Sequence, residues 1–273
     1  MKLLDVQNLH VSFRQKTGDV QAVRGVSLGL ERQGESLGIV GESGSGKSVT
    51  SLAIMQLVRE PPGVVTADTL TFNDVELRKL SRRQKRGIRG SEISMIFQEP
   101  MTSLDPVFTI ADQMTEAITL HQNVGRKAAT DVAADLLAKV DIDDPRGVLR
   151  SYPHQLSGGM RQRVMIAMAL SCRPKILIAD EPTTALDVTI QAQVLQLIKD
   201  LQEEIGTSLI MITHDLGVIA ETVDNVVVMY GGKVLEYGSV FDIFEQPAQP
   251  YTQALLRSIP DVSQKRAEKL SVI

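Results

Sequence analysis

The sequence predicts an α/β fold, with a mostly parallel sheet, an N-terminal antiparallel β subdomain and an inserted helical subdomain. A glycine-rich loop, Gly41-x-x-x-x-Gly46-Lys47-Ser48, stands between an apolar run and a stretch with helical spacing. Two later apolar runs, residues 176–179 and 208–213, are also separated by a helical stretch. Strand signals disappear between about residues 99 and 169. Alternating strands and helices are typical of a parallel sheet, and the gap in that alternation predicts the insert.

The N-terminal part has the alternation of antiparallel strands, broken by a polar, glycine-containing turn at residues 16–19. The glycine loop then has a strand before it and a helix, residues 48–58, after it. The strands predicted up to this point and just beyond are residues 6–13, 20–30, 36–40 and 92–97. Strand, loop and helix in this order are the setting in which such a glycine motif binds phosphate.

The second half completes the predicted organisation. Apolar residues recur at helical spacing within residues 132–140, and a helix is expected over residues 189–204. Gly231-Gly232 predicts a hairpin, because paired glycines suit tight turns with positive φ. We expect a single domain over residues 1–273. Its parts are a core at 1–98 and 170–237, a helical subdomain at 99–169 and a proline-containing tail at 238–273.

Composition excludes several classes of protein. The 273 residues include 29 basic and 33 acidic ones, and this net charge of −4 disfavours nucleic acid as the main partner. A run of basic residues at 78–89 is interpreted as a solvated helix face or loop, with a local basic patch as the alternative. The single cysteine, Cys172, excludes an intrachain disulfide and indicates a reducing compartment. No stretch approaches the ~20 apolar residues that span a bilayer, so a membrane role requires a partner.

The glycine loop carries the chemistry of a nucleoside triphosphate site. Glycines let the backbone wrap phosphates without Cβ clashes, and the helix start supplies unpaired N–H groups and a positive dipole end. Lys47 is expected to neutralise the β and γ phosphates, and the Ser48 hydroxyl to bind Mg²⁺. The predicted nucleotide-binding residues of the loop are Gly41, Glu42, Ser43, Gly44, Ser45, Gly46, Lys47, Ser48 and Val49.

Polar residues follow three other predicted strands. Asp180 and Glu181 follow the run 176–179, His214 follows 208–213, and Gln98 follows Phe97. The carboxyl ends of parallel strands share one edge of a sheet, the usual place for ligands. Asp180 suits a Mg²⁺ ligand, Glu181 a general base, and Gln98 a ligand of Mg²⁺ or of the attacking water. Taken alone, the acidic pair would fit a helix N-cap and Gln98 a polar loop.

A second glycine-containing helix start lies at Leu156-Ser157-Gly158-Gly159-Met160-Arg161-Gln162-Arg163. It has the same features of an anion site as the first loop. One nucleotide needs one such cradle, so the chain either folds the two together or offers one to a neighbour. Phe13 is a candidate for stacking on adenine and is equally consistent with a core residue.

Taken together and in this order, these motifs resemble the ATP-binding subunit of ABC transporters over essentially the whole chain. The resemblance implies a RecA-like P-loop core, in which Asp180 anchors magnesium, Glu181 is the catalytic glutamate, Gln98 is the Q-loop residue and His214 contacts the γ-phosphate. Phe13 occupies the position of an adenine-stacking aromatic. The resemblance also implies a head-to-tail dimer, in which Ser157, Gly158 and Gly159 cover the partner's ATP. Gln162 and, from the Ala185-Leu186-Asp187 loop that crosses the interface, Asp187 are also presented to the partner subunit.

Three segments resemble the dipeptide, oligopeptide and nickel importers within that family. They are residues 98–106, residues 152–155 and Pro250-Tyr251-Thr252-Gln253-Ala254-Leu255-Leu256. The resemblance implies ATP hydrolysis with Mg²⁺ that powers import of a small solute, either di- or oligopeptides or, alternatively, nickel. The cysteine-containing extension of many members, associated with an iron–sulfur cluster, is not expected in a chain whose only cysteine is Cys172.

The expected partners are a second ATP-binding subunit, identical or paralogous, and integral membrane permease subunits contacted by the helical subdomain. A solute-binding protein would act indirectly, and no nucleic acid is expected. The expected location is the cytoplasmic face of the membrane. A soluble ABC ATPase acting on DNA or ribosomes is a competing reading, but it would carry coiled coils, zinc motifs or a second ATPase unit. A non-hydrolysing regulator would lack Glu181 or His214, and both are present.

Overall fold

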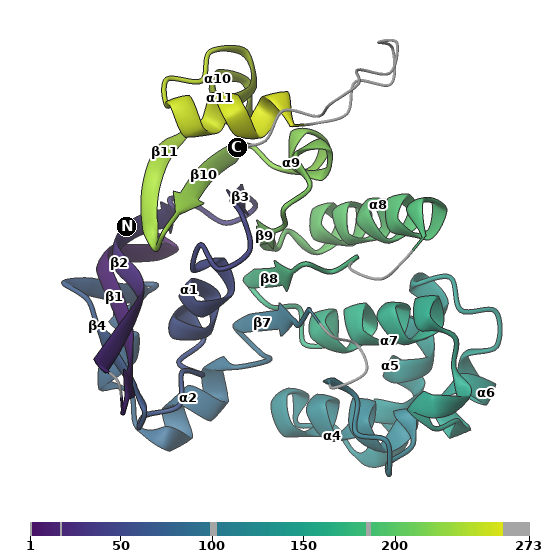
Figure 1. Cartoon of the computed structure of the whole chain (residues 1–273). Helices are drawn as coiled ribbons and strands as arrows, with labels where there is room; N and C mark the ends of the chain where they lie inside the picture. Colours follow the sequence, from purple (N-terminus) through teal and green to yellow (C-terminus); the bar gives the residue numbers. More distant parts are fainter. Residues whose placement is uncertain (1, 17, 99–102, 184–186, 259–273) are drawn as a thin grey trace, which may run out of the picture. The chain divides into compact units, whose positions relative to one another are not determined.

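The structure is a computed structural model, in which residues 2–16, 18–98, 103–183 and 187–258 are described, without the side chains of 188 and 189. These residues form two compact units. The first holds the chain up to Arg78 and from Met211 onward, and the second holds Lys79–Ile210 (Figure 1). Parts of four predicted features lie outside the described residues: residue 17 of the turn at 16–19, residues 99–102 of the 98–106 segment, Ala185-Leu186, and residues 259–273 of the tail.

The first unit begins with the predicted antiparallel sheet. Strand β1 (Leu4–Gln15) pairs antiparallel with β2 (Gly18–Leu30), as predicted, and β2 begins within the predicted break at residues 16–19. Three short strands that were not predicted complete this sheet: β4 (Gly63–Thr66), β5 (Thr69–Phe72) and β6 (Val75–Glu76). Strands of two to four residues are too short to show a period-2 pattern.

The phosphate-loop motif lies between β3 (Ser36–Val40) and α1 (Lys47–Ile54) in this unit, as predicted, although the helix is shorter than expected. All five residues of β3 are buried, which suits a parallel strand covered on both faces. Its neighbour β10 (Asn225–Tyr230) pairs parallel with it, and β11 (Lys233–Ser239) is antiparallel to β10 across the predicted Gly-Gly turn. The Asp224 carboxylate accepts hydrogen bonds from the Ser36 amide at 3.0 Å and its hydroxyl at 2.6 Å, which joins the starts of β3 and β10.

The C-terminal region is helical where a tail was predicted. After α9 (Leu216–Thr222), the chain forms α10 (Val240–Glu245) and α11 (Pro250–Arg257) beyond the hairpin. Ser239 caps α10 by accepting the Asp242 amide hydrogen at 3.1 Å. Pro250 occupies the first turn of α11, a position that needs no N–H donor. Pro250 therefore starts a helix in a region that was expected to be a tail.

The second unit contains two parallel neighbours, β7 (Ile93–Ile96) and β8 (Ile176–Asp180), with β9 (Ser208–Ile212) beside β8. Their residues are buried, as in the core of an α/β sheet. Helix α8 (Val188–Ile205), capped by Asp187, joins β8 to β9 as predicted. The last two residues of β9 belong to the first unit, where the Thr213 amide donates to the Ile39 carbonyl at 3.3 Å.

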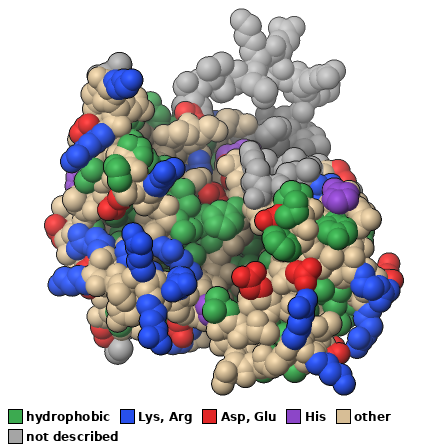
Figure 2. Space-filling view, turned by 90° about the horizontal axis from the view of Figure 1, so that it is seen from below, with side chains coloured by type: hydrophobic (Ala, Val, Ile, Leu, Met, Phe, Trp, Pro, Cys, Tyr) green, Lys and Arg blue, Asp and Glu red, His purple; other side chains and the backbone are tan. Residues whose placement is uncertain are grey.

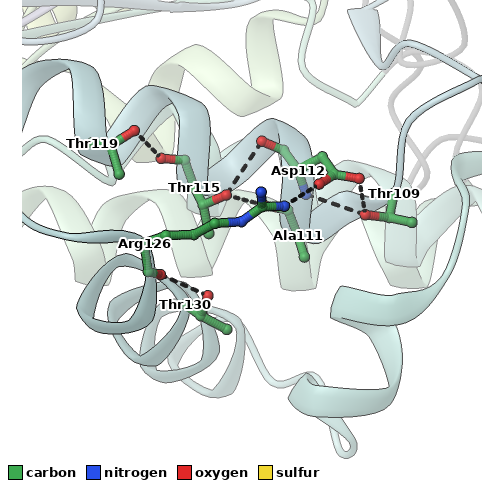
Figure 3. A network of polar contacts seen from close by, with 7 residues as sticks. All are labelled: Thr109, Ala111, Asp112, Thr115, Thr119, Arg126 and Thr130. Carbon is green, nitrogen blue, oxygen red and sulfur yellow. Dashed lines mark hydrogen bonds and ion pairs between the residues drawn. The ribbon is translucent and has the colours of Figure 1, made fainter.

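The predicted helical insert of the second unit comprises four α-helices among the described residues, with a 3-10 turn at Pro153–Gln155. Thr109 caps the first of them, and Arg126 at the start of the second forms a 2.7 Å ion pair with Asp112 (Figure 3). This network fixes two helix starts against each other. The helices are α4 (Ile110–Gln122), α5 (Arg126–Lys139), α6 (Pro145–Arg150) and α7 (Gly158–Leu170).

The basic run 78–89 forms a 3-10 turn (Leu77–Lys79) and helix α2 (Arg82–Ile88). Ser81 caps α2 in a capping box with Gln84, the signal that predicts a helix start here. Arg82, Arg83 and Arg86 are exposed on α2, which fits both a solvated helix face and a local basic patch. Figure 2 views the molecule from below the view of Figure 1 and shows Lys and Arg side chains gathered on the face where α2 lies.

Candidate functional site

The glycine loop in the first unit has the backbone that a phosphate cradle needs. Gly41, Gly44 and Gly46 have φ of 147°, 81° and 100°, a region that side-chain-bearing residues rarely adopt. A Cβ on Gly41 would lie 2.1 Å from the Met229 carbonyl oxygen, so only glycine fits. No side chain among the described residues caps α1 at Gly46. The loop therefore combines glycine conformations with a helix start that no side chain caps, as phosphate-binding loops do.

Lys47 is held inside this loop. Its side chain is buried, and Nζ donates to the carbonyls of Gly41 at 2.7 Å and Glu42 at 3.0 Å. The ammonium group is thereby curled over the loop it belongs to. Ser45 Oγ is also buried, and it lacks a hydrogen-bond partner within the described structure. A buried unpaired hydroxyl and a buried ammonium in a glycine loop fit a bound phosphate, which accepts from both.

Two further candidates lie in the first unit. Phe13 is half-buried on β1, opposite Val20, and its ring edge would lie 3.5 Å from a Cβ on Gly63. This partial exposure is compatible both with stacking on an adenine and with packing on the antiparallel sheet. His214 is exposed directly after β9, and Asp215 behind it caps α9. Both positions agree with the predicted strand and strand end.

The second unit brings together the acidic pair and the glutamine. Ile96 and Ala179 are paired in the parallel register of β7 and β8, so Gln98 and Glu181 each follow two residues later. Gln98 Nε2 donates to Glu181 Oε2 at 2.9 Å. Asp180 is the last residue of β8 and is buried, whereas Glu181 is partly exposed. Glu181 also has a left-handed backbone, with φ of 46°, a strain that often marks functional positions.

The second glycine motif starts α7 in the second unit. Ser157 is the N-cap, and its hydroxyl accepts the Met160 amide hydrogen at 3.2 Å. Ser157 and Gly158 are exposed, and a Cβ on Gly158 would meet no atom within 4 Å. Gly159 is half-buried, with Ile190 nearby. The motif therefore presents an open surface rather than an occupied cradle.

Gln162 and Asp187 lie in two different environments. The Gln162 side chain is only 1% exposed, and its amide donates to the Pro182 carbonyl, one residue after Glu181. The prediction that Gln162 is presented to a partner subunit does not fit this conformation, because the side-chain amide donates to a carbonyl of the same chain. Asp187 is exposed and caps α8 through the Ile190 amide at 3.0 Å. Sequence reasoning missed the Gln162 contact, which only the packing of α7 against the loop after β8 creates.

The predicted site residues thus divide between the units. Phe13, the loop 41–49 and His214 belong to the first unit, and Gln98, Asp180, Glu181 and the signature residues to the second. In the described parts of the chain, no cluster of three His, Cys, Asp or Glu residues could hold a metal ion. In addition, none of the described helices is long and apolar enough to cross a membrane.

Comparison with known proteins identifies the family. The model of the ABC transporter family matches residues 23–184, more than half of the chain. The chain belongs to the ABC transporter family. A second model, the oligopeptide/dipeptide transporter C-terminal region, matches residues 235–273. The resemblance inferred from the motifs is therefore confirmed, and with it an ATP-hydrolysing enzyme that uses ATP with Mg²⁺.

Relatives and solved structures agree with this ABC assignment. The dipeptide transport ATP-binding protein DppD of Bacillus subtilis (strain 168) is 55% identical over 267 residues, 98% of this chain and 79% of DppD. The glutathione import ATP-binding protein GsiA of Escherichia coli (strain K12) is 54% identical over 265 residues, 95% of this chain. The chain spans only 42% of GsiA.

Solved ABC cassettes share the fold. The dimeric cassette MJ0796 superposes with a TM-score of 0.75 at 27% identity, over 87% of this chain and 98% of that one. Another structure of MJ0796, with a TM-score of 0.74, is a post-hydrolysis dimer bound to ADP and Pi. The cbiO1 cassette of Clostridium perfringens gives a TM-score of 0.73 at 25% identity, over 90% of this chain and 91% of cbiO1. The predicted P-loop α/β fold is confirmed.

Proposed function

We propose that this chain is the ATP-hydrolysing subunit of an importer of di- and oligopeptides, located at the cytoplasmic face of the membrane. The observation that carries the proposal is the match of residues 235–273 to the oligopeptide/dipeptide transporter C-terminal region. This region lies outside residues 23–184, which match ABC transporters in general, and it therefore narrows the proposed cargo to peptides. The 55% identity to DppD, named for dipeptide transport, supports the same cargo.

In the first unit, the glycine loop binds the phosphates of ATP. Lys47 exchanges its two carbonyl acceptors for phosphate oxygens, and Ser45 gains the acceptor that its buried hydroxyl lacks. Ser48, at the start of α1, supplies a hydroxyl ligand for Mg²⁺, and Phe13 stacks on the adenine. His214 contacts the γ-phosphate. ATP is bound with Mg²⁺, whose charge offsets that of the phosphates.

In the second unit, the residues after β7 and β8 prepare the attacking water. The Glu181 carboxylate accepts the water proton as general base, and Gln98 orients that carboxylate through its amide. Asp180, buried at the end of β8, serves as the second protein anchor of Mg²⁺. The electrostatic stabilisation of charge on the transferring phosphoryl group comes from Lys47 and the loop amides.

The signature at α7 acts in trans, on ATP held by a second ATP-binding subunit. Support comes from the exposure of Ser157 and Gly158 and from the open space around Gly158. Asp187, exposed at the start of α8, lies in the loop that reaches across the subunit interface. The MJ0796 cassette was solved as a dimer, and a dimer is the assembly that a signature acting on a second subunit's ATP requires.

The permease contact belongs to the helical part of the second unit. Val107 and Phe108, just before α4, are 71% and 52% exposed, which is unusual for adjacent large apolar residues. They follow the Q-loop, so a permease bound there would be connected to the Gln98–Glu181 pair. The solute-binding protein acts through the permeases and delivers the peptide.

The decisive experiment is reconstitution. The chain is purified by affinity from detergent-solubilised membranes of its own cell, together with its bound partners, and reconstituted in proteoliposomes. Uptake of a radiolabelled dipeptide is then measured with and without ATP. We expect ATP-dependent uptake that the Glu181→Gln variant loses. ATP-dependent uptake of ⁶³Ni²⁺ in place of dipeptide would transfer the proposal to the nickel branch. Co-purification with ribosomes or nucleic acid, without permeases, would overturn it.

A further inference from the structure

The C-terminal helix touches the phosphate loop directly. Tyr251, the second residue of α11, accepts a hydrogen bond at its hydroxyl oxygen from the Glu42 amide, at 3.2 Å. The two residues are 209 positions apart in sequence and belong to the same compact unit. Glu42 directly follows Gly41 at the start of the loop. The contact therefore reaches a peptide group whose direction decides how the loop begins.

The tyrosine is fixed from two sides. Its ring packs against Tyr230 at a centroid distance of 4.7 Å and a tilt of 49°. Tyr230 is the last residue of β10, and two residues later the Gly232 amide donates to the Ser45 carbonyl at 3.0 Å. The hairpin therefore supports the far end of the same loop. Burial raises the pKa of the Tyr251 phenol above its ordinary value.

The start of α11 is pinned in turn. The Glu236 carboxylate on β11 accepts the Ala248 amide at 2.7 Å and the Gln249 amide at 3.2 Å. Gln253 Nε2 donates to the Pro247 carbonyl at 2.9 Å. Thr252 is 1% exposed, so the helix is seated on the unit rather than lying loosely on its surface. These contacts hold the start of α11, and the position of the Tyr251 hydroxyl therefore depends on how this C-terminal helix is held.

We propose that Tyr251 is a positioning residue for nucleotide binding, which holds the Glu42 peptide of the phosphate loop in its binding direction. This rests on the proposed function, in which the loop binds ATP. A loop with three positive-φ glycines has many alternative conformations, and fixing its entry reduces the entropy lost when phosphate binds. The C-terminal residues matched by the peptide-transporter model thereby affect the affinity for ATP as well as carrying a family signature.

The test uses Tyr251→Phe, which keeps the ring packing and removes only the hydroxyl. Calorimetric titration of the full chain with ADP and Mg²⁺ measures Kd without turnover. The loss of one neutral hydrogen bond predicts a Kd raised about 3- to 10-fold. Amide hydrogen exchange of a peptide containing Glu42 should become faster, while kcat at saturating ATP stays within about twofold. The matched control, Tyr230→Phe, removes the hydroxyl of the other ring and should bind ADP as the wild type does.

The outcomes separate this inference from the proposed function. An unchanged Kd and unchanged exchange at Glu42 in a folded Tyr251→Phe variant would overturn the positioning role. A drop in kcat with unchanged Kd would overturn it too, because the residue would then act on chemistry rather than on binding. Lys47→Ala is titrated alongside. If it binds ADP as tightly as the wild type, the phosphate loop is not the site, and the proposed function fails first.

Discussion

Gln98 donates a hydrogen bond from Nε2 to the Glu181 carboxylate at 2.9 Å. The contact follows from sheet register, because Ile96 of β7 pairs with Ala179 of β8 and each polar residue comes two positions later. Glu181 has a left-handed backbone, which costs of the order of 1–3 kcal/mol for a residue other than glycine. The fold therefore holds this carboxylate in one direction at the expense of local strain, which is compatible with its proposed role as general base.

Glu181→Gln is expected to bind ATP and to lose nearly all hydrolysis. The amide can still accept the hydrogen bond from Gln98 but cannot take a proton, so turnover should fall about 100-fold or more. A steady-state phosphate-release assay measures the rate, and size-exclusion chromatography with ATP should show an accumulated dimer. Glu203→Gln, at an exposed site on α8, is the matched control and should keep wild-type turnover. Near-normal turnover of Glu181→Gln would remove Glu181 from the mechanism.

Ser157→Arg is expected to abolish hydrolysis while nucleotide still binds. The serine is exposed at the start of α7, and an arginine there would block the half-site offered to a second subunit. The lost N-cap also costs about 1 kcal/mol of stability. Phosphate release, ADP titration and thermal unfolding are measured together.

Ser81→Arg is the control for that stability effect, because Ser81 caps α2 in the same way but lies outside the signature. It should lose similar stability and keep its ATPase rate. Wild-type hydrolysis by Ser157→Arg, with no wild-type subunit present, would show that the signature does not act on ATP.

The sequence predicted the parts of the site that depend on one strand end at a time. Gly41–Ser48 follows the fully buried strand β3, and Asp180 ends the fully buried strand β8; such apolar runs ending in polar residues are visible without any tertiary information. The partners of these residues could not be predicted. Gln162 looks like part of an exposed signature, yet the packing of α7 buries it and points its amide at the Pro182 carbonyl.

The C-terminal region shows the same limit. It was expected to be a proline-containing tail, whereas Pro250 starts α11 and Tyr251 lies against the phosphate loop. No local pattern relates residues 209 positions apart. Strands β4 to β6 were missed for a different reason. Each is only two to four residues long, and β4 and β5 pair with β1 while β6 pairs with β5, which are tertiary contacts.

Gln162→Leu is expected to destabilise the second unit. The substitution keeps the volume roughly constant but leaves the Pro182 carbonyl without its amide donor in a buried place. An unsatisfied buried acceptor costs about 1–3 kcal/mol. Urea unfolding followed by circular dichroism measures the free energy of unfolding. Gln193→Leu removes an exposed glutamine of α8 that accepts from Arg163 at 3.3 Å, and it should change stability by less than about 1 kcal/mol. Equal effects of the two variants would contradict a specific role for the Gln162 contact.

Asp112 should contribute to stability in a pH-dependent way. The Thr109 hydroxyl donates to its carboxylate at 2.6 Å and, with Arg126, lowers the pKa of Asp112 below its ordinary value of 3.8 (Figure 3). A carboxyl whose pKa is lower in the folded state stabilises the fold above its unfolded pKa. That contribution disappears as the pH falls through the folded pKa. Asp112→Asn should therefore be less stable than the wild type near neutral pH, with a difference that narrows on acidification.

Urea unfolding at about pH 6 and about pH 3 measures this narrowing. Asp135→Asn, at an exposed position on α5, serves as the control for the general loss of a negative charge. In a Thr109→Val background, the stability difference between Asp112 and its Asp112→Asn variant should narrow less on acidification. Thr109→Val removes the largest cause of the lowered pKa of Asp112. A stability difference between wild type and Asp112→Asn that stays constant over this range would mean that the network at the start of α4 acts through geometry alone.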